Sequence, residues 1–150
     1  MPGPIPSPFP VGESWDPDRD LPAPLTLRLY RGGAVLFTSQ GRWLHPLFDL
    51  GAFLAASGED PAGTRLVDRV TGRAAAFLVA RLGIPRLDTL VLSRRALDVL
   101  DRFGVRHRHQ VLVDRVLCVT EDLLGEVQDP AAAWALLQDR RTRALARRSE

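Results

Sequence analysis

The 150-residue sequence has no lysine, a single cysteine and no long apolar run. One cysteine excludes an internal disulfide and is typical of proteins kept in a reducing cytoplasm. No apolar stretch approaches the ~20 residues that a membrane-spanning helix needs, and the N-terminus lacks the basic and apolar regions of a secretory signal. We therefore expect a cytoplasmic protein that does not associate with membranes.

The absence of lysine also decides how the charge is interpreted. All 20 basic residues are arginines, and 18 acidic residues reduce the net charge to +2, although the isoelectric point is about 9.4. The high isoelectric point reflects the high pKa of arginine rather than a large excess of positive charge. A genome-wide bias towards Ala, Leu and Arg explains this composition, so the net charge argues against nucleic acid as a partner.

Prolines divide the chain into a tail and one domain. Eight of the 12 prolines lie in the first 24 residues, where they remove backbone donors. Residues 1–24 are therefore predicted to form an irregular, polyproline-like tail, from which Phe9 and Trp15 could dock on the domain or on a partner. Residues 25–138 have the length of a single domain. Residues 139–150 form an arginine-rich helix end, whose charges complement the helix dipole or, alternatively, bind phosphate groups.

Alternating leucines open the domain. Leu25, Leu27 and Leu29 recur at every second position, which is the period of a half-buried strand. The Gly32-Gly33 pair predicts a two-residue hairpin turn, with residues 34–39 as the returning strand.

Helices and strands alternate through the rest of the domain. Capping residues, a first-turn proline and apolar periodicity predict the helices, and apolar or alternating runs predict the strands. The predicted order is a helix over 42–58, a strand over 64–68, a helix over 72–82, a strand over 86–92, a helix from the Ser93 cap to Gly104, strands over 105–109 and 111–117, a turn capped by Thr120, and a last helix that begins at Asp129-Pro130. This order predicts a three-layer α/β domain whose mixed sheet opens with an N-terminal hairpin.

Common catalytic motifs are absent, since the sequence contains no G-x-G-x-x-G, Walker A, G-x-S-x-G or H-E-x-x-H pattern. His107 and His109 lie two residues apart on one face of a predicted strand, and with Cys118 they could form a three-ligand zinc site. Two solvated imidazoles are the simpler interpretation, so we predict no metal site and no cofactor. Cys118 could also serve as a nucleophile beside Asp114 if a base lies near it; the simpler alternative is a small structural residue.

Five segments carry a resemblance to a known family: LRLYRGGAVLFTSQGRWLHPLFDL, VDRVTGRAAAFL, SRRALDVLDRFGV, CVTEDLL and DPAAAWALL. With these segments in order, the chain from Leu25 to about Leu137 resembles a bacterial and archaeal family of unknown function with a cytidine-deaminase-like fold. The resemblance covers roughly three quarters of the chain, and it implies a deaminase-like α/β core.

The matching residues lie at two predicted helix starts. Where the family reads approximately D-K-V-x-G-K-A-A-A, this chain keeps Asp68, Gly72 and the three alanines, and it has Arg73 in place of the usual lysine. Where the family reads C-P-M-E, this chain keeps Cys118 and Glu121 but loses the proline and the methionine, together with a short loop before Cys118.

The resemblance implies a binding site rather than a zinc deaminase. Zinc deaminases begin these helices with H-x-E and P-C-x-x-C, whereas this chain has T-G-R-A-A-A and C-V-T-E. That mechanism is excluded unless ligands come from elsewhere. Two converging helix starts would instead bind a small anionic or nucleotide-like ligand, and the residues implied as ligand-binding are Asp68, Gly72, Arg73, Cys118 and Glu121.

Three alternatives to this ligand site stay open. Asp68 could pair with Arg73 while the alanines allow tight packing of the helix. The domain could be purely structural or bind a protein partner, or it could be a thiol enzyme that uses Cys118. Enzymatic activity and oligomeric state are not determined by the sequence.

Overall fold

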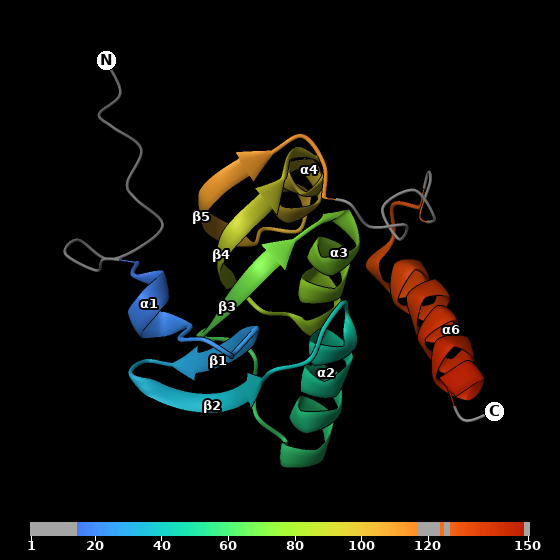
Figure 1. The fold of residues 1–150 in the computed structure, drawn as a ribbon, viewed down its shortest axis with the longest axis horizontal. Coiled ribbons are helices and arrows are strands. Elements are labelled where there is room, and N and C mark those ends of the chain that lie inside the picture. Colours follow the sequence, from blue (N-terminus) through green and yellow to red (C-terminus); the bar gives the residue numbers. More distant parts are fainter. Residues whose placement is uncertain (1–14, 117–123, 125–126, 149–150) are drawn as a thin grey trace.

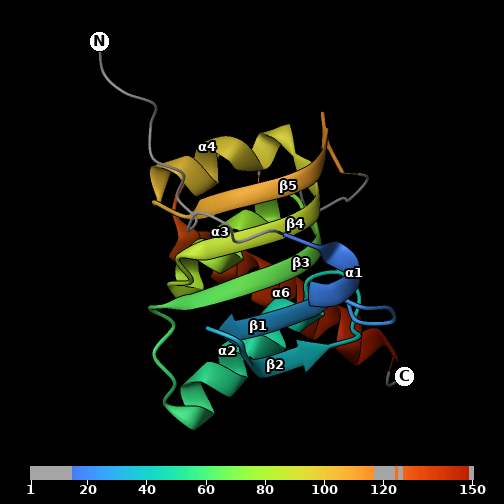
Figure 2. The ribbon, with the colours of Figure 1, turned by 90° about the vertical axis from the view of Figure 1, so that its left-hand side faces the viewer.

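Five strands form one mixed sheet in the computed structural model, which describes residues 15–116, 124 and 127–148. The spatial order is β2-β1-β3-β4-β5 (Figures 1 and 2). The bounds are β1 (Leu27–Arg31), β2 (Ala34–Ser39), β3 (Thr64–Thr71), β4 (Arg86–Ser93) and β5 (Arg106–Val113). Strand β1 pairs antiparallel with β2 and β3, whereas β3, β4 and β5 are parallel. The predicted mixed sheet with an opening hairpin is confirmed.

Local signals place the hairpin and the helix ends where the sequence predicts them. Gly32 turns the hairpin with a φ of 58°, which only glycine adopts easily. The Ser93 hydroxyl accepts from the backbone N–H of Arg95, and Asp129 caps the last helix in the same way. The helices are α1 (Pro17–Asp20), α2 (His45–Ser57), α3 (Arg73–Leu82), α4 (Arg94–Arg102) and α6 (Pro130–Arg148).

All the long helices lie on one face of the sheet. Figure 2 shows α2, α3 and α4 behind the strands, with α6 beyond them, whereas α1 lies in front. Helix α6 packs against α3 rather than against the sheet. The layers are therefore the sheet, then α2 to α4, then α6, and among the described residues the opposite face of the sheet is covered only by α1 and its flanking segment.

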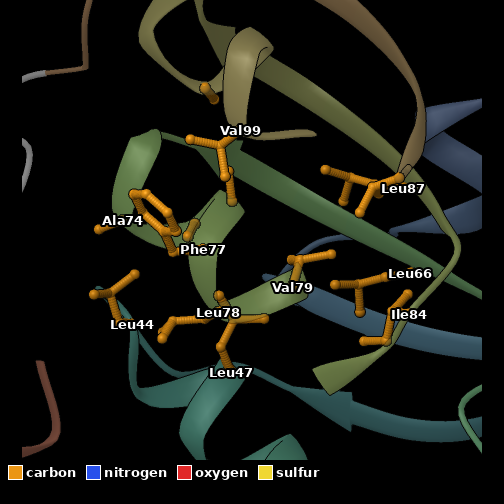
Figure 3. Packing of buried hydrophobic residues seen from close by; sticks show 14 of the residues in the cluster. Leu44, Leu47, Leu66, Ala74, Phe77, Leu78, Val79, Ile84, Leu87 and Val99 are labelled. Atoms are coloured by element: carbon orange, nitrogen blue, oxygen red, sulfur yellow. The ribbon is translucent and has the colours of Figure 1, made fainter. Parts of the chain in front are cut away.

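The main core lies between the sheet and α3. Phe77, Leu78 and Val79 are fully buried, and Figure 3 shows Leu78 near Leu47 of α2, Val79 near Leu66 of β3 and Phe77 towards Val99 of α4. Truncating a side chain such as Phe77 to alanine costs about 3–5 kcal/mol in a core of this kind. The apolar α3 therefore anchors the segment that connects β3 to β4.

One predicted pair of strands is a single strand. Residues 105–109 and 111–117 were expected to form two strands, but β5 runs without a break from Arg106 to Val113 and pairs with β4 along this length. Gln110 continues the strand because its side chain is exposed at the edge of the sheet. The predicted cap at Thr120 lies outside the described residues.

The described part of the proline-rich segment is not an irregular tail. Residues 17–20 form the short helix α1, which Asp16 caps. Asp20 is buried and pairs with Arg65 of β3, and Leu21 is buried against Tyr30. Proline content could not reveal this docking, because an ion pair and an apolar contact with distant strands hold the segment. Residues 1–14, with Phe9, lie outside the described residues.

Candidate functional site

A pocket of about 200 Å³ lies at the end of β3, beside the segment that enters α2. The first turns of α2 and α3 both line it, through Pro46 and Ala75 respectively. The polar and aromatic residues that line it are Thr26, Arg42, Trp43, Asp68 and Arg69. Among the described residues, the two helix starts that meet at this pocket are those of α2 and α3; the segment around Cys118 lies outside the described residues.

Asp68 is the buried carboxylate of this pocket. Only 9% of the residue is exposed, and its Oδ1 accepts from the backbone N–H of Arg69 at 2.8 Å. Thr71 Oγ1 lies 3.2 Å from Asp68 Oδ2. Burial raises the pKa of Asp68 to about 7, because the hydrogen bonds from Arg69 and Thr71 offset only part of the cost of desolvating a charge.

Two threonines connect Asp68 to the backbone of β4. Thr71 Oγ1 lies 3.0 Å from Thr89 Oγ1, which donates to the carbonyl oxygen of Val91 at 3.2 Å. A neutral Asp68 completes this chain, since its O–H donates to Thr71, Thr71 donates to Thr89, and Thr89 donates to Val91. An ionised Asp68 instead accepts the hydrogen bond from the Thr71 hydroxyl. The Thr89 hydroxyl then has one hydrogen for two acceptors, Thr71 Oγ1 and the carbonyl oxygen of Val91. The neutral carboxyl therefore allows all three contacts to be hydrogen bonds, one more than the carboxylate allows.

Trp43 forms an aromatic wall in a strained backbone conformation. Its φ is 58°, in the left-handed region that costs a residue other than glycine on the order of 1–3 kcal/mol. Trp43 is 37% exposed, and the centroid of its ring lies 5.0 Å from that of His45 in an edge-on arrangement. Such strain is common at binding sites, and the pattern of the sequence does not reveal it.

Two arginines give the pocket positive charge. Arg42 is exposed and Arg69 is half-buried, and both line the cavity. Arg69 Nη2 donates to the carbonyl oxygen of Leu25 at 2.6 Å, which fixes the direction of this side chain. The pocket thus combines a carboxyl, an indole ring and guanidinium groups. Of these residues, the sequence singled out Asp68 alone, since an Arg-Trp pair before a helix carries no recognised signal.

Arg73 lies away from this pocket. It is 8% exposed at the start of α3, where its Nη2 donates to the carbonyl oxygen of Val127 at 2.7 Å. Its guanidinium carbon also lies 4.9 Å from the centre of the Phe77 ring. The described contacts of Asp68 are with Arg69 and Thr71, so Asp68 and Arg73 do not form the pair that the sequence left open.

The outcome differs among the other candidate residues. Gly72 is the buried N-cap of α3 and lies next to Thr71. Cys118 and Glu121 lie outside the described residues, so their predicted roles stay predictions. Asp114, expected beside a thiol nucleophile, pairs with Arg94 at 3.1 Å and is almost fully exposed.

Donor chemistry at the start of α3 does not fit zinc. None of Thr71, Gly72 and Arg73, which lie at the start of α3, is a zinc ligand of the usual kind. His107 Nε2 lies 3.0 Å from Asp101, and His109 is exposed at the sheet edge. Within residues 15–116, 124 and 127–148, no three histidine, cysteine or acidic side chains are grouped as metal ligands would be.

Residues 24–140 match the family described as "TM1506: Domain of unknown function (DUF1893)". The chain belongs to the DUF1893 family. A similar solved structure is the crystal structure of a DUF1893 family protein (TM1506) from Thermotoga maritima. The two chains are 23% identical, with a TM-score of 0.69 over 77% of this chain and 80% of that chain. No curated protein matches the chain.

Membership of the DUF1893 family confirms the resemblance to a family of unknown function. The similar structure supports the mixed α/β fold with its five-stranded sheet. Among the described residues, no helix has the length and apolar composition that crossing a membrane requires.

Proposed function

We propose that this DUF1893 domain binds a small nucleotide-like ligand, with a heteroaromatic ring and an anionic group, in the pocket at Asp68. The observation that carries the proposal is a buried carboxyl at the wall of a cavity that also contains an exposed indole and two arginines. A buried ionisable group with a shifted pKa at the wall of a cleft is a candidate for a functional site. Strained Trp43 supports the same site.

Each side chain matches one part of such a ligand. Trp43 offers a flat face on which a nucleobase can stack, as aromatic side chains do in base-recognition pockets. Asp68 can donate or accept at the edge of the base, because a carboxyl whose pKa is about 7 has both forms near neutral pH. Arg42, at the exposed rim, can pair with a phosphate or carboxylate.

The size of the pocket limits the ligand. A volume of about 200 Å³ is smaller than the roughly 300–1,000 Å³ of sites for drug-sized molecules. It therefore suits a single base, while the sugar and the anionic group extend towards Arg42. A mononucleotide fits this description better than a dinucleotide cofactor.

We further propose that the fold is of the cytidine-deaminase type, which the motif at β3 and α3 supports through its family resemblance. In this proposal Thr71, Gly72 and Arg73 occupy the helix start at which a zinc deaminase has its H-x-E motif. Deamination through zinc is no part of the proposed function, because the side chains at the start of α3 are not zinc ligands. The single cysteine supports a cytoplasmic location for such a domain.

Thermal unfolding in the presence of nucleosides, mononucleotides and sugar phosphates tests the proposal. A ligand at about 100 times its dissociation constant adds about 2.7 kcal/mol to the free energy of unfolding. We expect a mononucleotide to raise the melting temperature, and Trp43→Ala to remove the shift. Arg94→Ala, an exposed substitution on α4, is the matched control and should keep it. The absence of a shift with every compound in the set would contradict the proposal and favour a structural or protein-binding role.

A further inference from the structure

Arg141 of α6 contacts the beginning of α2 with two of its guanidinium nitrogens. Its Nε donates to His45 Nδ1 at 3.1 Å, and its Nη2 donates to Asp49 Oδ1 at 2.8 Å. The guanidinium carbon also lies 5.3 Å from the centre of the Phe48 ring, and the Arg141 side chain is only 21% exposed. Because a planar guanidinium fixes the directions of all its donors together, these contacts hold Arg141 in one orientation against α2.

The hydrogen bond from Arg141 determines the state of the His45 imidazole. A guanidinium stays protonated and can only donate, so His45 Nδ1 accepts and the neutral ring carries its hydrogen on Nε2. The direction of the ring is fixed as well, because a hydrogen bond prefers to lie along the lone pair of its acceptor. Arg141 therefore sets both the tautomer and the orientation of the His45 ring.

The oriented His45 ring supports Trp43 in the wall of the pocket. The two ring centroids lie 5.0 Å apart with an interplanar angle of 73°, which is the edge-to-face arrangement that aromatic rings favour. Trp43 has a φ of 58°, and a residue keeps such a conformation only where its surroundings hold it there. The contact with His45 is one of the interactions that hold the indole in this position.

Helix α6 reaches this wall without lining the pocket, since none of the described residues around the cavity belongs to α6. Trp134, seven residues before Arg141, packs edge-on against Phe48 with 4.8 Å between the ring centroids. Seven residues make about two helical turns, so Trp134 and Arg141 share one face of α6 and both contact Phe48. The contacts from Arg141 through His45 to Trp43 thus connect a helix outside the pocket to its aromatic wall.

We propose that Arg141 is a positioning residue for the pocket at Asp68. Through His45 it holds the Trp43 ring in the orientation in which a base stacks on it, so that α6 influences the affinity of a pocket that it does not line. This inference rests on the proposed nucleotide function. The placement of Trp43 can be measured without a ligand, however, so the two proposals can fail separately.

A purely structural role of Arg141 predicts a different outcome. If Arg141 only attached α6 to α2 through Asp49 and Phe48, its removal would lower the stability of the protein. The affinity of the folded protein for a mononucleotide would then not depend on the bond between Arg141 and His45. The experiments therefore measure the environment of Trp43 and the coupling between Arg141 and His45, as well as stability.

Fluorine NMR of the full chain labelled with fluorotryptophan tests the placement of Trp43. The sequence has three tryptophans, so three resonances are expected, and Trp43→Phe assigns the resonance of Trp43. Arg141→Ala should move or broaden this resonance. The resonance of Trp15, which packs on the α1 side of the sheet, should stay unchanged. Arg143→Ala is the matched control, because it removes the same charge from a side chain of α6 that is 74% exposed, and it should leave both resonances in place.

Calorimetric titration with the common ribonucleoside monophosphates measures the effect on binding. Arg141→Ala should weaken the binding of a mononucleotide about tenfold, a loss within the range that base stacking on an aromatic side chain provides. His45→Phe keeps a ring beside Trp43 but removes the acceptor of the Arg141 bond. The double variant should bind no more weakly than His45→Phe alone, because Arg141 acts through His45.

Circular dichroism melts show whether each variant is folded. If Arg141→Ala unfolds, Arg141→Lys takes its place: an ammonium lacks the planar fork that contacts His45 and Asp49 together, so the Trp43 resonance should still move. An unmoved Trp43 resonance in a folded variant would overturn the positioning role, whether or not a ligand binds. Losses that multiply in the double variant would assign Arg141 to packing instead. If no mononucleotide binds the natural chain but Arg141→Ala moves the Trp43 resonance, the nucleotide function is refuted and the placement of Trp43 by Arg141 is supported.

Discussion

Replacing Asp68 by asparagine should make the protein more stable at alkaline pH. The asparagine amide is isosteric with a neutral carboxyl: its oxygen can accept from the Arg69 N–H, and its NH₂ can donate to Thr71 Oγ1. Thr71 can then donate to Thr89, and Thr89 to the carbonyl oxygen of Val91. The substitution should therefore complete the hydrogen-bond chain at every pH.

The raised pKa sets the size and the direction of the effect. Burial moves the pKa of Asp68 from 3.8 to about 7. The folded protein then holds this proton over a range of pH in which the unfolded chain has released it. The stability of the natural protein consequently falls as the pH rises from about 4 to about 7 and stays reduced above that range. A shift of about three units corresponds to roughly 4 kcal/mol at most, since each unit is worth about 1.4 kcal/mol.

Urea unfolding of both proteins between pH 4 and pH 8.5 measures this effect. The difference in the free energy of unfolding should be small near pH 4 and should grow in favour of Asp68→Asn, up to about 4 kcal/mol above pH 7. Asp114→Asn is the control, because that side chain is 94% exposed and should change stability within about 0.5 kcal/mol. Equal stabilities of the natural protein and Asp68→Asn at pH 8.5 would refute a buried carboxyl with a raised pKa.

Three further predictions concern packing and composition. Arg73→Ala should lower the free energy of unfolding by about 1–3 kcal/mol, because it leaves the carbonyl oxygen of Val127 without this donor. Arg73→Lys should recover part of the loss. Thermal melts in which Arg73→Ala is as stable as the natural chain would contradict this prediction. Leu21→Ala should cost about 2–4 kcal/mol, since Leu21 is 3% exposed, and an unchanged melting temperature would show that α1 does not dock in solution. Elemental analysis of the purified protein should find no stoichiometric zinc, whereas one zinc per chain would revive a site with Cys118, His107 and His109.

Local sequence determined most of the secondary structure. The hairpin turn at Gly32 and the cap at Ser93 depend on residues within a few positions of one another, so their signals can be read from a short window. The same holds for the apolar run of α3, which is buried wherever the chain places it. These elements appear in the structure with bounds close to those predicted.

Tertiary structure decided the candidate site. Asp68 was selected by its family resemblance, but its neighbours were not. The parallel pairing of β3 with β4 brings Thr89 beside Asp68, and the packing of α2 against α3 and β2 brings Trp43 to the same pocket. The raised pKa follows from burial, which no spacing in the sequence states. Cys118 and Glu121 stay predictions.

The row of arginines across the sheet and the docked N-terminal helix show the same division. Each strand by itself determines that its arginines alternate with core residues, since that period is local. Only the strand order and register place Arg65, Arg86 and Arg106 in one row, and only the ion pair between Asp20 and Arg65 holds a proline-rich segment against the sheet. Periodicity is a property of neighbours in the chain, whereas charge density on a surface is a property of neighbours in space.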